Sequence, residues 1–270
     1  MRLLSFSSSV LALAGATSIP IDGYTVAVTT STGKKVQMQL DTYLWTTSVP
    51  PEFADTHFTM GAGVSWEDDK VESETPWGPV TSASLGLAPS SAFMAAHGVV
   101  TINPKQGKMV VGEFDPSDMC KEGQMTYTAQ TWDLDQWLVS VEWNSGSFGD
   151  SVEPFIIDYR TDSDIKTIVP PPLRDSYYSF FAERVSAYAA EGKTYTVEIA
   201  RTEVPVIHLK AGDMDVSLTP EEYVVEGPGG PKTIFTDNQM ILALFNPFVL
   251  DRFVVQLDRT NNRAGICTPL

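Results

Sequence analysis

The chain is poor in the residues that metal and redox chemistry need. Its 270 residues include three histidines and two cysteines. The histidines His57, His97 and His208 are scattered without the spacing of a metal site, so we predict no metal and no cofactor. The sequence also has no Gly-x-Ser-x-Gly elbow, no phosphate-binding glycine loop and no zinc motif. These absences argue against the enzyme classes that such motifs mark.

Positive charge is also scarce. The chain has 18 Lys and Arg residues and 34 Asp and Glu residues, which gives a formal net charge of -16 and a pI of about 4.4. A surface of this sign repels nucleic acid and anionic lipid, so we expect neither nucleic acid nor a membrane as a partner. The excess of acid suits an acidic medium, where carboxylates are protonated, but it is equally typical of simple colloidal solubility.

Long apolar runs are missing except at the start of the chain. Arg2 is the only charged residue before Asp22, and residues 3–16 are apolar with interspersed serines, ending in the small residues Ala14-Gly15-Ala16. This pattern predicts a signal peptide over residues 1–18 and a secreted, extracellular protein. No later segment is long and apolar enough to span a bilayer.

The two cysteines are Cys120 and Cys267. In a secreted chain an even number of cysteines indicates a disulfide, and two unpaired buried thiols are the alternative. No Asn-x-Ser/Thr sequence occurs, so we expect no N-glycosylation.

Most of the chain has the pattern of short strands separated by glycine and proline. The strand candidates are residues 24–30, 36–40, 99–102, 108–114, 137–143, 194–199, 204–209, 214–218 and 253–257. Helical periodicity is evident over residues 172–185, after a run of prolines, and weaker over residues 90–97. Many strands and few helices predict an all-β protein, either a sandwich, a barrel or a bilobal fold.

Two of the apolar strands end in an aspartate, one in each half of the chain. Residues 36–42 have the sequence VQMQLDT and residues 155–161 the sequence FIIDYRT, which place Asp41 and Asp158 at the strand ends. An aspartate in this position is usually a turn former, so neither residue alone is evidence of catalysis. A charged run at residues 66–74 is typical of a solvated loop and lacks the spacing of a calcium site.

The order of further motifs gives these aspartates more weight. Together they resemble the secreted pepsin-like aspartic proteases, especially those of fungi. The matching segments are GKMVVGEFDPS at 107–117, WLVSV at 137–141, the FIID strand with the later PPPLRDSYY, ALFNPFVLDRFVVQLDR at 243–259 and NNRAGI at 261–266.

The resemblance implies an all-β, bilobal pepsin-like (acid protease) fold with a reduced N-terminal lobe. It divides the mature chain into a truncated N-terminal lobe at residues 19–105 and a C-terminal lobe at residues 106–270. Asp41 and Asp158 are 117 residues apart, closer than is usual in the family, and no Tyr-Gly-Asp-Gly flap follows the first of them. The segment at residues 84–88 resembles the apolar-apolar-Gly turn that crosses behind the first catalytic loop.

In the family two aspartates form the catalytic pair, and the resemblance assigns this role to Asp41 and Asp158. Neither is followed by Thr-Gly. Thr42 is kept, but Gly-Ser-Ser is missing, so that Tyr43 follows it directly. The second loop is longer than the family's, and Asp162 is the alternative to Asp158.

The second loop carries the larger losses. Tyr159 stands for the threonine, Arg160 for the glycine, and Thr161 completes the loop. We therefore expect a catalytically impaired homologue that binds peptide or protein in an open cleft. The alternative is an active acid endopeptidase that uses the two aspartates and an activated water.

The resemblance also implies where the remaining residues lie. We expect Tyr43, Trp45 and Tyr159 to bring aromatic surface close to the cleft. For Trp45 the favoured alternative is packing in the core of the N-terminal lobe, as the family's equivalent tryptophan does. In the family the regions of Cys120 and Cys267 meet in the sheet that joins the lobes, which favours a bridge between them. We expect a monomer whose partner is a peptide or protein ligand.

Overall fold

The computed structural model describes residues 15–121, 123–129, 135–144, 150–159, 167–168, 194–196, 206–211, 214–227, 230–236, 243–245 and 247–270. The helix predicted at residues 172–185 lies outside these ranges. The weaker helix prediction is confirmed by α1 (Ala92–His97), whose N-terminus is capped by the Ser91 side chain accepting the N–H of Met94.

Strands dominate the described residues, so the predicted all-β class is confirmed. The strands of the first half are β1 (Thr17–Pro20), β2 (Thr25–Thr30), β3 (Lys35–Asp41), β4 (His57–Met60), β5 (Val64–Glu67), β6 (Glu74–Thr75), β7 (Gly78–Pro79), β8 (Ser84–Gly86), β9 (Val99–Asn103) and β10 (Lys108–Val111).

The second half follows the same pattern, with short helices between the strands. Its strands are β11 (Thr126–Ala129), β12 (Leu138–Asn144), β13 (Asp150–Ile157), β14 (Thr167–Ile168), β15 (Thr194–Thr196), β16 (Ile207–Ala211), β17 (Met214–Leu218), β18 (Val224–Gly227), β19 (Gly230–Thr236), β20 (Ala243–Phe245), β21 (Val254–Asp258) and β22 (Arg263–Cys267). The helices that the structure describes beyond α1 are η1 (Pro51–Phe53), η2 (Pro104–Gln106), η3 (Pro116–Asp118), α3 (Pro220–Tyr223) and α4 (Pro247–Leu250).

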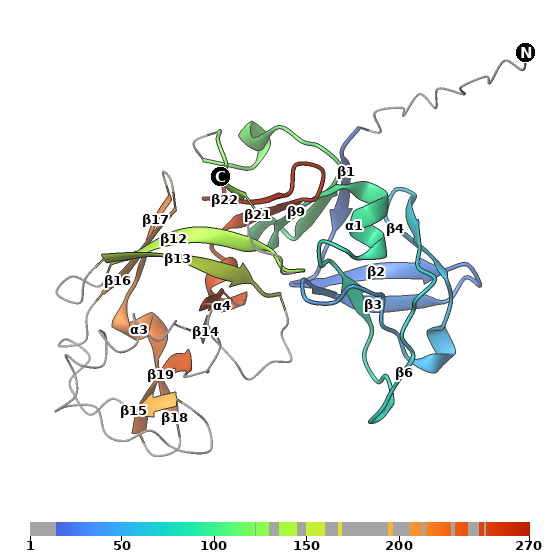
Figure 1. The fold of residues 1–270 in the computed structure, drawn as a ribbon, viewed down its shortest axis with the longest axis horizontal. Helices are drawn as coiled ribbons and strands as arrows, with labels where there is room; N and C mark the ends of the chain where they lie inside the picture. Colours follow the sequence, from blue (N-terminus) through green and yellow to red (C-terminus); the bar gives the residue numbers. More distant parts are fainter. Residues whose placement is uncertain are drawn as a thin grey trace, which may run out of the picture.

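The described strands form four sheets, and the three larger ones build two lobes. A five-stranded sheet, in the order β5-β4-β2-β3-β8, forms the N-terminal lobe. A nine-stranded sheet, in the order β15-β19-β14-β20-β13-β12-β16-β17 with β18 beside β19, forms the C-terminal lobe. A six-stranded sheet, β1-β10-β9-β21-β22-β11, takes strands from both halves and joins them (Figure 1). The predicted division between residues 105 and 106 falls inside η2, between two paired strands of this sheet.

The N-terminal sheet shows how the sequence specifies the fold. In β2 the side chains of Val26 and Val28 are buried while Ala27 is exposed, and in β3 Met38 and Leu40 are buried while Gln37 is exposed. This alternation fixes the pairing register, because a slip of one residue would turn every apolar side chain to solvent. On its other side β3 pairs with β8, and this pairing sets Asp41 at the end of the strand opposite Gly86.

The joining sheet is closed by a disulfide. Cys120 and Cys267 are bonded, with their Cα atoms 5.7 Å apart and a separation of 147 positions in sequence. Of the two alternatives for these cysteines, the structure therefore has the bridge. It lies in a small apolar cluster with Val110, Met119 and Val254, and it ties the C-terminal end of the chain to the segment after β10.

Candidate functional site

The first aspartate is held at the end of a parallel strand pair. β3 runs parallel to β8 with Asp41 opposite Gly86, and the Asp41 side chain is 8% exposed. Its Oδ1 accepts the backbone N–H of Tyr43 at 2.8 Å and of Leu44 at 3.2 Å. The loop after Asp41 therefore keeps its backbone donors turned back onto the carboxylate, although no glycine follows Thr42.

Gly86 is the position where β8 passes behind this loop. A Cβ atom there would lie 2.4 Å from the carbonyl oxygen of Thr46 and 2.6 Å from that of Leu44. Only glycine permits such a close approach of two backbones. The N–H of the next residue, Leu87, donates to the carbonyl oxygen of Asp41 at 2.7 Å. The predicted crossing behind the first loop is thus present in the structure.

The second aspartate has the same setting in the other lobe. β13 runs parallel to β20 with Ile157 opposite Phe245, and Asp158 follows at once, 1% exposed. Each lobe therefore ends a parallel strand pair in a buried aspartate. Arg160, Thr161, Asp162 and Asn246 lie outside the residues that the structure describes.

Thr42 links the two aspartate loops directly. Its Oγ1 donates to the carbonyl oxygen of Ile157 at 2.6 Å and accepts the N–H of Tyr159 at 3.3 Å. These two partners are the residues on either side of Asp158. One buried hydroxyl thus bridges the lobes and brings Asp158 to the loop of Asp41, although the two aspartates are far apart in sequence.

Tyr159 does not face a cleft, so that expectation was wrong. The side chain is fully buried, and its ring lies against Tyr24 with 5.2 Å between centroids. The Tyr24 hydroxyl donates to Oδ1 of Asp251, which lies just after α4. Burial, and then the negative charge of Asp251, raise the pKa of Tyr159 well above its usual range, so its hydroxyl is neutral. Tyr159 has become part of the packing between the lobes.

The aromatic residues after Asp41 divide between buried and exposed positions. Tyr43 packs on Leu138 and Ile156, which belong to β12 and β13 of the C-terminal lobe. Trp45 is 65% exposed, so the expectation that it packs in the core was wrong. The core of this lobe instead contains Trp66, which stacks on Phe58 with ring centroids 5.2 Å apart.

A hairpin that the sequence analysis missed lies between β5 and β8. β6 and β7 form a two-stranded sheet with Trp77 at its turn, 96% exposed (Figure 1). Its base is attached to the chain just beyond the Asp41 loop, because Val49 N–H donates to Glu72 O and Glu72 N–H donates to Thr47 O. The signal was the Pro-Trp-Gly-Pro turn at residues 76–79, which lacks the family's flap sequence.

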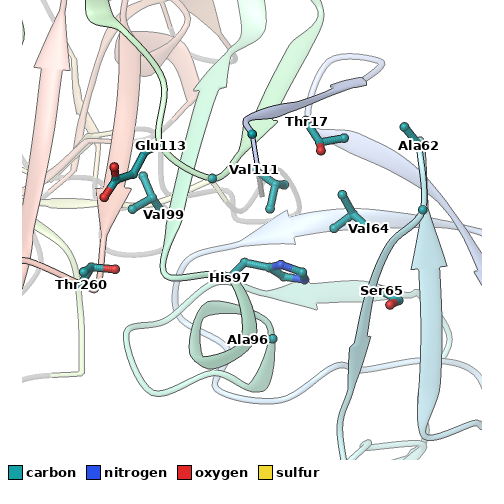
Figure 2. Close-up of a pocket in the computed structure, with 13 residues that line it drawn as sticks. Thr17, Ala62, Val64, Ser65, Ala96, His97, Val99, Val111, Glu113 and Thr260 are labelled. Atoms are coloured by element: carbon teal, nitrogen blue, oxygen red, sulfur yellow. The ribbon is translucent and has the colours of Figure 1, made fainter. Parts of the chain in front are cut away.

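A separate pocket of about 500 Å³ is lined by residues of α1, β5, β9 and the segment around the end of β10. Its lining includes Val99, Val111 and Glu113, and Figure 2 shows the His97 ring extending from α1 toward Val64. The His97 ring lies 4.7 Å from that of Phe93. Burial lowers the pKa of His97, against the smaller opposing effect of a hydrogen bond to the Ser65 backbone.

Within the described ranges, no group of three or more His, Cys, Asp or Glu side chains could hold a metal ion. No helix in that same part of the chain is long and apolar enough to cross a membrane.

Comparisons with known proteins identify the fold. No family model matches the sequence, and no curated protein matches it. Among solved structures, the aspartic proteinase from Irpex lacteus matches with a TM-score of 0.67 and 15% identity, over 94% of this chain and 97% of that one. The architecture is therefore the all-β, bilobal pepsin-like fold that the sequence motifs predicted. At this identity the likeness establishes the fold alone.

Proposed function

We propose that this protein is a secreted, pepsin-like chain that binds extended peptide or protein segments beside Asp41 and Asp158 and cleaves them inefficiently or not at all. The pepsin-like scaffold supports the binding half of this proposal. The damaged second loop supports the loss of catalysis.

Peptide hydrolysis on this scaffold needs two carboxylates that share one proton. Repulsion between them keeps one neutral and one ionised, so that the ionised group activates water while the neutral group protonates the carbonyl oxygen. Asp41 and Asp158 stand at equivalent strand ends, each largely buried, with Thr42 bonded to both neighbours of Asp158. This arrangement supports the two aspartates as the pair that faces a bound peptide.

The one-sided bridge between the loops is the observation that carries the proposal. Thr42 reaches across to the second loop, but Tyr159, in the matching position, cannot return the bond because its side chain is buried against Tyr24. Within the described residues, the two loops are therefore held together by the side chain of the first loop alone, with no matching side-chain hydrogen bond from Tyr159. Since orientation contributes about 7–11 kcal/mol to such reactions, a displacement of about 1 Å can cost roughly 100-fold in rate.

The second loop also carries Arg160 where the family has glycine. A guanidinium that faces the two aspartates favours their ionised forms and so works against the shared proton, whereas one that faces solvent leaves that proton in place. The family's glycine at that position carries neither charge nor side chain.

The alternative function is an acid endopeptidase that works with these unusual loops. It is favoured by the survival of both aspartates and of the Thr42 bridge. Secretion, common to both functions, is supported by the apolar N-terminal segment and by the Cys120–Cys267 disulfide, since disulfides persist in oxidising compartments.

Hydrolysis of an unfolded protein substrate near pH 4 tests the proposal, with and without a statine-type transition-state inhibitor. We expect no inhibitor-sensitive cleavage above that of Asp41→Asn. Robust cleavage that the inhibitor blocks and that Asp41→Asn abolishes would establish the endopeptidase instead. Circular dichroism of both proteins controls for folding.

A further inference from the structure

Two tryptophans stand exposed on the N-terminal lobe. Of the large apolar side chains whose burial the structure describes, the exposed ones are Trp45, Trp77, Val206 and Leu270. Trp45 and Trp77 are the aromatic members. A tryptophan that is 96% exposed, as Trp77 is, buries almost none of its large apolar surface in the fold, and tryptophan is among the side chains enriched at interfaces.

The backbone ties both tryptophans to one unit. Trp45 lies two residues before Thr47, whose carbonyl oxygen accepts the N–H of Glu72 at 2.9 Å. Trp77 lies five residues after Glu72, so the chain limits its distance from that junction to about 17 Å. The chain alone therefore keeps the Cα atoms of the two tryptophans within about 30 Å of each other, a span that an extended peptide of about nine residues covers.

The surroundings of Trp77 are acidic. Residues 67–79 contain five carboxylates and one lysine. Two of the carboxylates have partners within the fold. Asp68 accepts the backbone N–H groups of Thr47 and Lys70, and Oε1 of Glu67 lies 3.2 Å from Nε2 of His57. Asp69 and Glu74 are exposed, and their side chains make no hydrogen bond or ion pair to any described residue, although the backbone of Glu74 pairs with Pro79 in the β6–β7 sheet. Glu74 begins β6, three residues before Trp77.

We propose that this tryptophan hairpin, residues 72–80 together with Trp45, selects basic segments of extended polypeptide. The inference rests on the proposed function, because it names the class of peptide that the same site takes. Lysine and arginine side chains are attracted to the faces of tryptophan rings, and the exposed carboxylates add Coulombic attraction of matching sign. The net charge of -16 favours approach of a cationic ligand in the same way.

Fluorescence anisotropy with two labelled, unstructured peptides of equal length, one rich in lysine and arginine and one with glutamate in their place, tests the selection at about pH 6. We expect the basic peptide to bind at least about tenfold more tightly, and its affinity to fall as salt is raised, because exposed charges are screened. Trp77→Leu keeps apolar surface but removes the ring, and we expect it to weaken basic-peptide binding about five- to tenfold. Leu270→Ala is the control for loss of an exposed apolar side chain.

A charge variant tests the acidic contribution separately. Glu74→Gln should weaken binding of the basic peptide and make it less sensitive to salt, whereas Glu52→Gln, an exposed carboxylate on η1, should leave both unchanged. If both peptides bind the wild type equally and Trp77→Leu changes nothing, the selection is refuted while peptide binding stands. If neither peptide binds, both the selection and the proposed function fail.

Discussion

Substituting Thr42 by valine tests whether one hydroxyl joins the two aspartate loops. Valine has the shape of threonine but cannot bond, so Thr42→Val leaves the carbonyl of Ile157 and the N–H of Tyr159 without this partner. Each buried polar group that loses its bond costs about 1–3 kcal/mol. We expect a loss of about 3 kcal/mol in the free energy of unfolding, which in a chain of this size lowers the Tm by roughly 6–12 °C.

The same loop offers a matched control. Thr46 is also buried, but its Oγ1 has no hydrogen-bond partner among the described residues, so Thr46→Val should be neutral or slightly stabilising. Urea unfolding of both variants, followed by intrinsic fluorescence, gives the midpoint and the slope, and an unchanged slope means that stability alone has changed. Equal midpoint shifts for the two variants, or no shift for Thr42→Val, would refute the bridge.

Three further predictions concern stability. Replacing both Cys120 and Cys267 by alanine should cost about 5 kcal/mol on the chain-entropy estimate for the loop that they close, measured by urea unfolding, and a change below about 1 kcal/mol would contradict it. Gly86→Ala should destabilise the N-terminal lobe severely, by more than about 3 kcal/mol, since its Cβ would overlap the Thr46 carbonyl; a Tm close to that of the wild type would show that the loop can move aside. Burial lowers the pKa of His97 in the folded state, so the neutral ring's contribution to folding stability is complete above the unfolded pKa of about 6.5 and is lost as the pH falls below it. The Tm of His97→Phe should therefore decline less than that of the wild type between about pH 7 and pH 4. Parallel declines would exclude this effect.

The strand pattern was the part of the structure that the sequence specified best. The alternation of apolar and polar residues in β2, β3 and β12 predicts strands without any tertiary information. The disulfide could be predicted from the expected oxidising compartment and the approximate position of each cysteine in the fold. The ends of β3 and β13 were located because apolar runs lead directly into Asp41 and Asp158.

Side-chain direction could not be predicted in the same way. Tryptophan is usually buried, and the family's equivalent tryptophan packs in the core, but Trp45 is exposed. A buried tryptophan of the same lobe is Trp66, whose Nε1 donates to the Thr47 hydroxyl. Tyr159 was assigned to the cleft from its place beside Asp158. Its actual partner, Tyr24, is distant in sequence, and only the assembled lobes bring the two rings together.

The central claim is that binding persists on this scaffold while catalysis is lost. A single labelled peptide that carries a fluorophore and a quencher at its ends measures both quantities in one reaction near pH 4, since anisotropy reports binding and dequenching reports cleavage. The account predicts saturable binding to the wild type, with a dequenching rate no higher than that of Asp41→Asn. Rapid dequenching by the wild type that disappears in Asp41→Asn would contradict it.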